Sequence, residues 1–367
     1  MAGHDCDMST FVVQKSINYF LENGNEIVFR CFLDLSKVYD TVNHDLLFMK
    51  LMERHTPTFI VKFLRNWSKK QDLYVKWNSS KSVSFKASNG VRQGSVLSPA
   101  LFNVYVDDLI TGSEQSGVGV RINGRFSGGI AYADDLSLLS TSREGMQRLL
   151  QICESFATDH CLKFNIQKSK SISFRKRRFI YCKETAFSIN GESLPEVHDV
   201  IHLGHKLSTV PKETTGAVEE RCRKLYSSLY SIVGAVKGVG RNPTVWTTIL
   251  YYVLLPVLGY GCELWDLGMG STKRLLHQAW RRGYRRGLGI SNRTSLRVTL
   301  GEPIREAPDL LCVSQLSFLW RAVHSSNELV SGFILNTQGN LWRSVDNETR
   351  TRIMVLSYMN FKSWIKP

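Results

Sequence analysis

Three aspartates are the residues whose types and spacing could do metal-dependent chemistry. Asp34 follows the apolar run 27–33, and Asp134 and Asp135 lie between two short apolar segments. Two Mg²⁺ ions held roughly 3.5–4 Å apart can activate an attacking hydroxyl and stabilise a leaving pyrophosphate. Carboxylate oxygens are the hard ligands that Mg²⁺ prefers. If the fold brings them together, these carboxylates predict a centre for two-metal phosphoryl transfer.

An Asp-Asp pair alone is most often a polar turn, and the sequence contains a second pair that serves as a control. Asp107-Asp108 lies in the helical pattern that starts near Ser98 and Pro99. Adjacent residues on a helix diverge by about 100°, so the two side chains cannot easily converge on one ion. We therefore interpret Asp107-Asp108 as a solvated helix face.

The elements that must position the three aspartates follow from the hydrophobic pattern. Residues 27–33 are β-branched and aromatic, which predicts a buried strand that ends at Asp34. Residues 126–140 predict two short strands folded about residues 133–134. A strand end beside a tight turn is a rigid place from which side chains can converge. The clearest amphipathic helix follows, over 146–160.

Other predicted elements surround this centre. Ser98 is the expected N-cap of a helix with Pro99 at its first position. The remaining helices are expected at 10–22, 44–53, 59–68, 218–236 and 244–258, with a hairpin between Leu73 and Ala87.

Charge indicates the class of partner. The 367 residues include 47 Lys+Arg against 32 Asp+Glu, a formal net charge of +15. Such a balance favours a polyanion, and nucleic acid is the commonest one. The 43% apolar content is typical of a globular chain, long enough here for two or three domains.

The cysteines and the apolar stretches bear on location. The eight cysteines include no Cys-x-x-Cys pair, so no zinc knuckle is indicated, and scattered single cysteines suit a reducing compartment. The N-terminus lacks the features of a signal peptide. The longest apolar stretch, 249–262, is shorter than the ~20 residues of a membrane helix. We expect an intracellular protein of the nucleus or cytoplasm, neither secreted nor bound to a membrane.

Five segments resemble, in the same order, the palm motifs of reverse transcriptases from non-LTR (LINE-type) retrotransposons. One such motif is only suggestive, but five in order are strong. The resemblance covers roughly residues 10–265. The segments are Phe32–Val42 followed by His44, Asn89–Pro99, Tyr132–Asp135, Leu162–Lys170 and Leu203–His205.

The resemblance implies roles for the acidic residues and for one aromatic residue. Asp34 and Asp134 would be the principal metal ligands, and Asp135 would support the second ion or the primer end. The ion would be Mg²⁺, with Mn²⁺ as a substitute. Tyr39 falls where the family keeps an aromatic wall that excludes the 2′-hydroxyl of ribonucleotides, although simple core packing is the alternative for this ring.

The same resemblance implies a nucleotide pocket. Gln93 and Gly94 would line it, since a glycine lets backbone approach a ligand and a glutamine amide can hydrogen-bond to it. Lys168 would protonate the leaving pyrophosphate or steady the triphosphate. The alternatives are a plain turn before a helix for Gly94 and a solvated cation for Lys168.

Two basic segments, 168–183 and 273–297, combine cations with aromatics. In the second, the planar guanidinium groups suit phosphate, while Trp280 and Tyr284 could stack on unpaired bases. A solvated helix face is the alternative for any one of these residues. The candidate nucleic-acid-binding residues are Arg281, Arg282, Arg285 and Arg286.

The implied fold class is α+β: a polymerase palm, with an antiparallel sheet and packed helices, followed by a helical thumb-like domain. The expected boundaries are 1–210 for the palm with partial fingers, 211–265 for the thumb-like region and 266–367 for a basic C-terminal extension. Only some thirty residues precede Asp34. We therefore expect a chain without the N-terminal fingers and the endonuclease domain.

The implied activity is RNA-directed DNA polymerisation, with an RNA template, a DNA primer and deoxynucleoside triphosphates as partners. An inactive retroelement remnant that only binds nucleic acid is the alternative. A nucleotide cyclase, which shares the palm, is disfavoured because it needs neither a template-site loop at 89–99 nor thumb-like helices. The sequence leaves the oligomeric state open.

Overall fold

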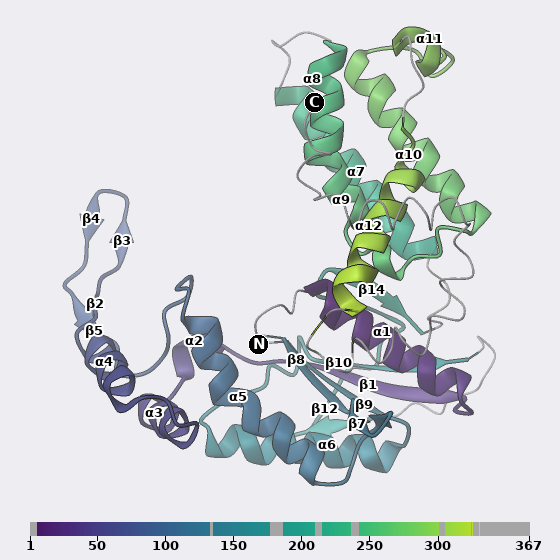
Figure 1. Ribbon diagram of the computed structural model, residues 1–367. Coiled ribbons are helices and arrows are strands. Elements are labelled where there is room, and N and C mark those ends of the chain that lie inside the picture. Colours follow the sequence, from purple (N-terminus) through teal and green to yellow (C-terminus); the bar gives the residue numbers. More distant parts are fainter. Residues whose placement is uncertain are drawn as a thin grey trace. The chain divides into compact units, whose positions relative to one another are not determined.

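A computed structural model describes residues 6–132, 135–176, 186–209, 215–235, 242–300, 305–323, 325 and 330 (Figure 1). The chain divides into two compact units, each described here by itself. The sheet unit consists of residues 16–203 and 208–210. The helical unit consists of residues 1–15, 204–207 and 211–367.

The sheet unit is built on four strands in the order β10-β1-β9-β8, all antiparallel to their neighbours. The central strand β1 therefore has a partner along both edges. Its predicted span of 27–33 is confirmed, as are the two strands predicted within 126–140. The strands are β1 (Ile27–Asp34), β8 (Gly129–Tyr132), β9 (Asp135–Ser140) and β10 (Lys170–Arg175).

One face of this sheet packs into the main hydrophobic core. Cys31 and Leu33 of β1 are buried there beside Leu136 and Leu138 of β9. Successive residues of a strand alternate between faces. The intervening positions, Asp34 among them, therefore project from the opposite face. The core is completed by α3 (His44–Glu53), α4 (Thr58–Lys69), α5 (Ser98–Gln115) and α6 (Arg143–Asp159).

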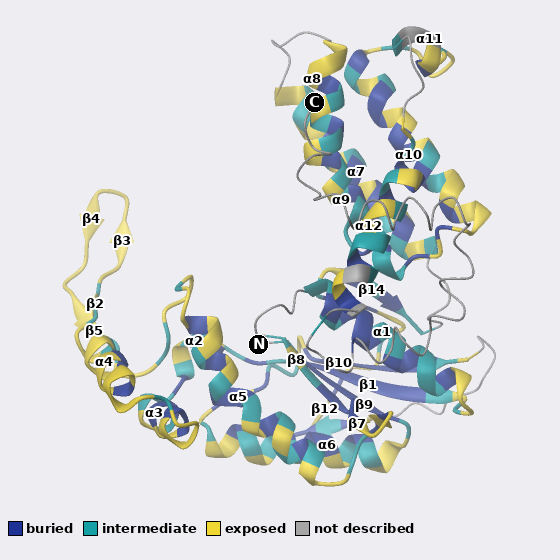
Figure 2. Cartoon of the chain, in the orientation of Figure 1, coloured by how far each residue is buried: buried dark blue, intermediate teal, exposed yellow. Residues whose placement is uncertain are grey.

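The predicted hairpin between Leu73 and Ala87 is confirmed as a ladder in which β2 pairs with β5 and β3 with β4. Figure 2 shows that it is largely exposed. The smaller elements of this unit are α2 (Val38–Thr41), β2 (Asp72–Leu73), β3 (Lys76–Trp77), β4 (Ser80–Lys81), β5 (Phe85–Lys86), β6 (Arg121–Ile122), β7 (Arg125–Phe126), β11 (Ser188–Ile189), β12 (Glu192–Ser193) and β13 (Asp199–His202).

The prediction that Ser98 caps α5 was wrong. The helix begins at Ser98 itself, Leu97 occupies the N-cap position, and no side chain caps the helix. The Ser98 hydroxyl instead donates to the carbonyl oxygen of Arg92 at 2.5 Å. A serine at a helix start can bond to whichever backbone group is nearest, and here the preceding loop turns back far enough to offer one. Pro99 lies in the first turn, as expected.

The helical unit has its own core, formed by leucines of α7 and η1 around the fully buried Trp280. This core includes residues from Val218 to Leu311. The elements are α7 (Thr215–Ala235), α8 (Pro243–Ile249), the π-helical turn η1 (Leu250–Leu254), α9 (Leu255–Gly259), the 3₁₀ turn η2 (Cys262–Leu264), α10 (Gly270–Leu288), α11 (Leu296–Leu300) and α12 (Ala307–Val323). Helix α1 (Cys6–Glu22) contributes residues 6–15, and β14 (His205–Ser208) contributes residues 205–207.

Helices predicted at 218–236 and 244–258 correspond to α7 and to the run from α8 to α9. The second run is interrupted by the π-helical turn η1 just before Pro256. A proline has no N–H to donate to the carbonyl four residues earlier, and its ring crowds that carbonyl. A widened turn is a common accommodation in such a place. In the described part of the chain, no helix is both long and apolar enough to cross a membrane.

Candidate active site

Two of the predicted carboxylates lie directly opposite each other. Asp34 is the last residue of β1 and Asp135 the first of β9, and the two are register partners in the antiparallel ladder. Directly opposed residues of such a ladder project from the same face, with Cβ atoms roughly 4.5–5.5 Å apart. Neither carboxylate belongs to the hydrophobic core, and the Asp34 side chain is 31% exposed. Both residues are partly exposed at the end of their strands and can therefore meet a ligand there.

Asp134, the third carboxylate of the prediction, lies outside the described residues, as does Ala133. The strands on either side of the turn are described, and Tyr132 of β8 pairs with Asp135 of β9. The described part of the motif therefore places Asp135 beside Asp34 at the end of β1.

Lys168 is brought to the same place. Its Nζ lies 3.9 Å from Oδ2 of Asp34, while the lysine side chain stays 70% exposed. An ion pair this open is weak, because solvent screens it and the side chain keeps its freedom. The cation therefore stands at the carboxylates without being locked to them.

The loop that carries Lys168 is fixed by Ser169 and Asn165, which were not predicted as site residues. The Ser169 hydroxyl accepts a hydrogen bond from the backbone N–H of Asp34 at 3.1 Å. The backbone N–H of Asn165 donates to the Asp34 carbonyl at 2.8 Å, and the Asn165 side chain accepts from the N–H of Lys168 at 3.3 Å. Both residues belong to the 162–170 motif, so the motif identified the segment but not these hydrogen bonds, which we call the 165–169 latch.

Tyr39 lies beside the loop that contains Gln93 and Gly94. Its ring is half-buried against Phe102 of α5, with centroids 5.4 Å apart. Its carbonyl oxygen accepts a hydrogen bond from the N–H of Val91 at 2.6 Å. The structure thus joins the aromatic residue of the first motif to the loop of the second.

Gly90 and His44 hold this junction, and neither was predicted as a site residue. Gly90 has φ +93°, and a Cβ there would come within 2.8 Å of the Tyr39 carbonyl oxygen. Its own carbonyl bonds Nε2 of His44 at 2.6 Å. Only glycine fits such a close backbone approach at positive φ. His44 could have been suspected, since it follows the first motif directly.

Gln93 and Gly94 lie exposed in the loop. Gly94 has φ +80°, and a Cβ added there would meet nothing within 4 Å. The backbone thus leaves open space at Gly94, which suits close approach by a ligand and equally suits a plain turn.

The control pair Asp107-Asp108 is confirmed as a helix face on α5, and it has cationic partners. Asp107 pairs with Arg54 at 2.7 Å, and Asp108 pairs with Lys50 of α3. The Lys50 side chain is only 8% exposed, whereas those of Asp107 and Asp108 are 42% and 51% exposed. These carboxylates hold two helices together.

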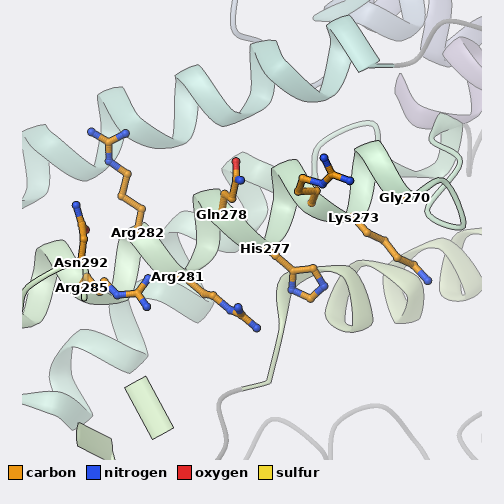
Figure 3. Close-up of a pocket in the computed structure, with 9 residues that line it drawn as sticks. Gly270, Lys273, His277, Gln278, Arg281, Arg282, Arg285 and Asn292 are labelled. Carbon is orange, nitrogen blue, oxygen red and sulfur yellow. The ribbon is translucent and has the colours of Figure 1, made fainter. Parts of the chain in front are cut away.

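The four predicted arginines all lie on α10, and Arg281, Arg282 and Arg285 line a groove of about 780 Å³ (Figure 3). Arg282 points to the opposite side of the helix from Arg281 and His277. Arg281 and His277 both contact Glu306, at 2.6 and 2.9 Å. The groove is lined by Gly270, Lys273, Arg274, His277, Gln278, Arg281, Arg282, Arg285 and Asn292.

The expectation that Trp280 and Tyr284 could stack on bases was wrong. They are 0% and 2% exposed, and the Trp280 indole N–H donates to the Arg305 carbonyl at 3.0 Å. Residues four apart on a helix share a face, and this face turns into the core of the helical unit. The aromatics that accompany the arginines are instead Tyr226 and Tyr230 of α7. The Arg282 guanidinium lies 4.9 Å from the Tyr226 ring centroid.

Comparison with known protein families decides the identity of this arrangement. Residues 7–207 match the family described as reverse transcriptase (RNA-dependent DNA polymerase), a match that covers more than half of the chain. The chain belongs to the reverse transcriptase family. The expected α+β fold is confirmed, since the sheet with its packed helices is the palm and a separate helical unit accompanies it.

Relatives of this reverse transcriptase are polymerases of non-LTR retrotransposons. It is 27% identical over 168 residues to the type-2 retrotransposable element R2DM polyprotein of Drosophila melanogaster, covering 45% of this chain and 16% of the relative. It is 25% identical over 276 residues to the RNA-directed DNA polymerase from mobile element jockey of the same species, covering 71% and 28%. The chain thus spans less than a third of the length of these relatives.

Among solved structures, the reverse transcriptase is similar to apo telomerase from Candida tropicalis. The identity is 10%, the TM-score is 0.45, and the match covers 90% of this chain and 57% of that one. A telomerase structure truncated from its C-terminal domain gives 11% identity and a TM-score of 0.42.

Reverse transcriptases use divalent metal ions, and the residues described fit such a group. Asp34 and Asp135 offer hard oxygen ligands from opposed positions on one face of the sheet. Among the described residues, the Asp34 carboxylate has one loose cationic partner, in contrast to the closely paired Asp107 and Asp108. A carboxylate set of this kind has the chemistry of a divalent-metal site.

Proposed function

We propose that this chain is the palm and thumb core of an RNA-directed DNA polymerase. The observation that carries the proposal is the register pairing of Asp34 with Asp135, with Lys168 3.9 Å from Asp34. Two partly exposed carboxylates and a cation at the end of a rigid sheet suit nucleotidyl transfer. We assign 1–210 to the palm with partial fingers, 211–265 to the thumb-like region and 266–367 to a basic C-terminal extension.

Asp34, Asp134 and Asp135 would hold Mg²⁺, or Mn²⁺ in its place. When bound, the ions activate the primer hydroxyl and stabilise the leaving pyrophosphate. The protein fixes the ligands in advance: Asp34 through its backbone bonds to Asn165 and Ser169, and Asp135 through the β9 ladder. Ligands held in place before the substrate arrives need no reorganisation during the reaction.

Lys168 would give a proton to the leaving pyrophosphate or bind the triphosphate. Its side chain is 70% exposed, so the ammonium can move from Asp34 to a phosphate oxygen. The 165–169 latch fixes the backbone of the loop and leaves this side chain free to travel. General acid catalysis of this kind contributes about 10²–10⁴-fold to a rate.

Nucleotide selection would fall to Tyr39, Gln93 and Gly94. The Tyr39 ring is backed by Phe102, which makes it a firm wall against a ribose 2′-hydroxyl. The loop of Gln93 and Gly94 is tied to the Tyr39 segment through Gly90 and Val91, so the wall and the loop are positioned together.

The template-primer partner would contact the cations of α10. Arg281, Arg282, Arg285 and Arg286 all lie on this helix, and Lys273 and Arg274 extend the groove toward its start. Sequence-independent binding to a phosphate backbone needs several cations at once. Deoxynucleoside triphosphates complete the set of substrates. We expect the polymerase to work in the nucleus or cytoplasm, where its cysteines stay reduced.

The test is extension of a DNA primer on an RNA template with Mg²⁺. The parent chain should extend the primer, and Asp34→Asn should abolish extension. Asp107→Asn is the matched control, because it removes an aspartate charge of similar exposure from the same unit and should leave extension unchanged. Extension that persists in Asp34→Asn overturns the proposed site.

A protein that only binds nucleic acid is the second candidate, favoured by the cationic groove of α10. Under that function the parent binds the template-primer duplex at low salt, and it extends no primer with either metal. Binding should weaken steeply as salt rises, because the release of counterions from the nucleic acid is less favourable in concentrated salt. A parent chain that binds the template-primer duplex but extends no primer would select this candidate.

A further inference from the structure

A second cluster of metal-binding residue types lies in the helical unit. Asp7 comes from the first turn of α1, His205 opens β14, and Glu263 lies in η2. Each offers one ligand atom, and these atoms all lie within 4.8 Å of one another. Three segments far apart in the sequence therefore bring an imidazole and two carboxylates to one point.

His205 is the member that points to a ligand. Its side chain is 6% exposed, and its Nε2 is buried with no hydrogen-bond partner among the residues the structure describes. Leaving a buried polar atom unsatisfied costs about 1–3 kcal/mol. A buried polar atom is normally paired, and a metal ion is one partner that an imidazole nitrogen takes.

The imidazole is held firmly from two sides. Its ring stacks on Tyr260 with centroids 4.7 Å apart and planes 22° apart. On the other side lies Gly261, at φ +86°, where a Cβ would overlap Nδ1 of His205. Glycine is thus required for the ring to fit. Because Nδ1 faces this backbone, Nε2 is the nitrogen left to bind an ion.

The cluster combines the carboxylates of Asp7 and Glu263 with nearby cations. Arg221 lies over Tyr260 at 4.4 Å and donates to the Gly204 carbonyl, and Lys224 is a second positive charge near His205. The ligand atoms themselves come from the imidazole and the two carboxylates.

We propose that Asp7, His205 and Glu263 bind a Zn²⁺ ion in the helical unit, separate from the carboxylates of the palm. A nitrogen ligand with two carboxylate oxygens suits Zn²⁺ better than Mg²⁺. Around a tetrahedral Zn²⁺ the ligand atoms stand about 3.4 Å apart, given bonds of about 2.0–2.1 Å. Rotation of the two carboxylates closes the remaining distance, and a water molecule takes the fourth position.

The ion would act as a clip. It would join the start of α1 to β14 and to the turn after α9, and more than fifty residues of chain separate each ligand from the next. A cross-link that closes long loops stabilises mainly by restricting the unfolded chain. Binding to the folded state alone also raises stability by mass action. The Zn²⁺ would thus fasten the N-terminal helix to the helical unit.

The test is Zn²⁺ titration of the full chain after chelator treatment, followed by calorimetry and thermal unfolding. The parent should bind one equivalent more than Asp7→Asn, Glu263→Gln or His205→Gln, and Zn²⁺ should raise Tm in the parent by more than in the variants. Asp309→Asn is the matched control for Asp7→Asn, because Asp309 also lies in the first turn of a helix. It should bind like the parent.

Two further comparisons exclude other zinc sites. Ions held by the free cysteines would be retained in all three variants, so only the difference from the parent counts. Adding Asp7→Asn to Asp135→Asn should remove one further equivalent, which separates this ion from the palm. Equal stoichiometry and equal Tm rise in the parent and Asp7→Asn overturn the proposal. So does a lost equivalent in Asp309→Asn, or no further loss when Asp7→Asn is added to Asp135→Asn.

Discussion

Asp34 and Asp135 on the sheet and Asp107 and Asp108 on α5 are made of the same residue type, yet their surroundings differ. On α5, each carboxylate has a cation at ion-pair distance, and one of these cations, Lys50, is nearly buried. At the end of β1, Asp34 makes a loose contact with the exposed Lys168.

The difference separates a structural carboxylate from one available for chemistry. A carboxylate that compensates a buried cation cannot be withdrawn without leaving that cation unpaired. A partly exposed carboxylate at a strand end, whose backbone the sheet holds in place, can accept a metal ion. The residue type is the same at both places, and the partners around each carboxylate decide its role.

The largest effect is expected at the palm. Asp135→Asn should lower the rate of primer extension about 10³-fold, since a metal ligand contributes several kcal/mol to transition-state stabilisation. The free energy of unfolding should stay within about 0.5 kcal/mol of the parent value, as is usual for a surface change. Single-turnover extension and urea unfolding measure the two quantities. A large loss of stability would place Asp135 with the structural carboxylates.

Lys168→Gln should lower the extension rate about 10²-fold, the lower end of the range for a general acid. Stability should hardly change, because its ion pair with Asp34 is exposed and screened. Lys176→Gln, in the same basic segment, is the control and should extend primer like the parent. If both variants slow extension equally, the charge of the segment matters and the position of Lys168 does not.

Asp108→Asn should show the opposite behaviour. Removing this charge leaves the nearly buried Lys50 with less compensation, and we expect a loss of about 1–2 kcal/mol in the free energy of unfolding. The rate per folded molecule should stay within about twofold of the parent, as expected away from the reacting atoms. Urea unfolding and extension assays decide this. A lower extension rate with an unchanged free energy of unfolding would mean that the α5 aspartates do not differ in role from those at the end of β1.

The smallest effect is expected from Asp107→Asn. Both Asp107 and Arg54 are about two-fifths exposed, so breaking their contact should cost no more than about 0.5 kcal/mol. Thermal unfolding at two salt concentrations measures this, and the difference should shrink as salt rises. A cost as large as that of Asp108→Asn would mean that exposure does not explain the ranking on α5.

Periodicity predicted most of the elements correctly because it reports which side chains are buried. The strand at 27–33, the amphipathic helix of α6 and the helices α7 to α9 follow directly from it. Periodicity reveals nothing about local backbone partners. The bond from Ser98 to Arg92 and the close approach of Gly90 to Tyr39 depend on where a loop returns in space, so neither could be predicted.

For this protein, the sequence by itself determined the reverse transcriptase family and the segments that carry its motifs. The identity and order of Asp34, Gln93 and the 132–135 turn are properties of the chain alone. Only the tertiary structure decided that Trp280 is core and that Lys168 reaches Asp34. It alone gathered Asp7, His205 and Glu263 into one cluster. Contacts between residues far apart in the chain depend on packing, and no short sequence pattern encodes them.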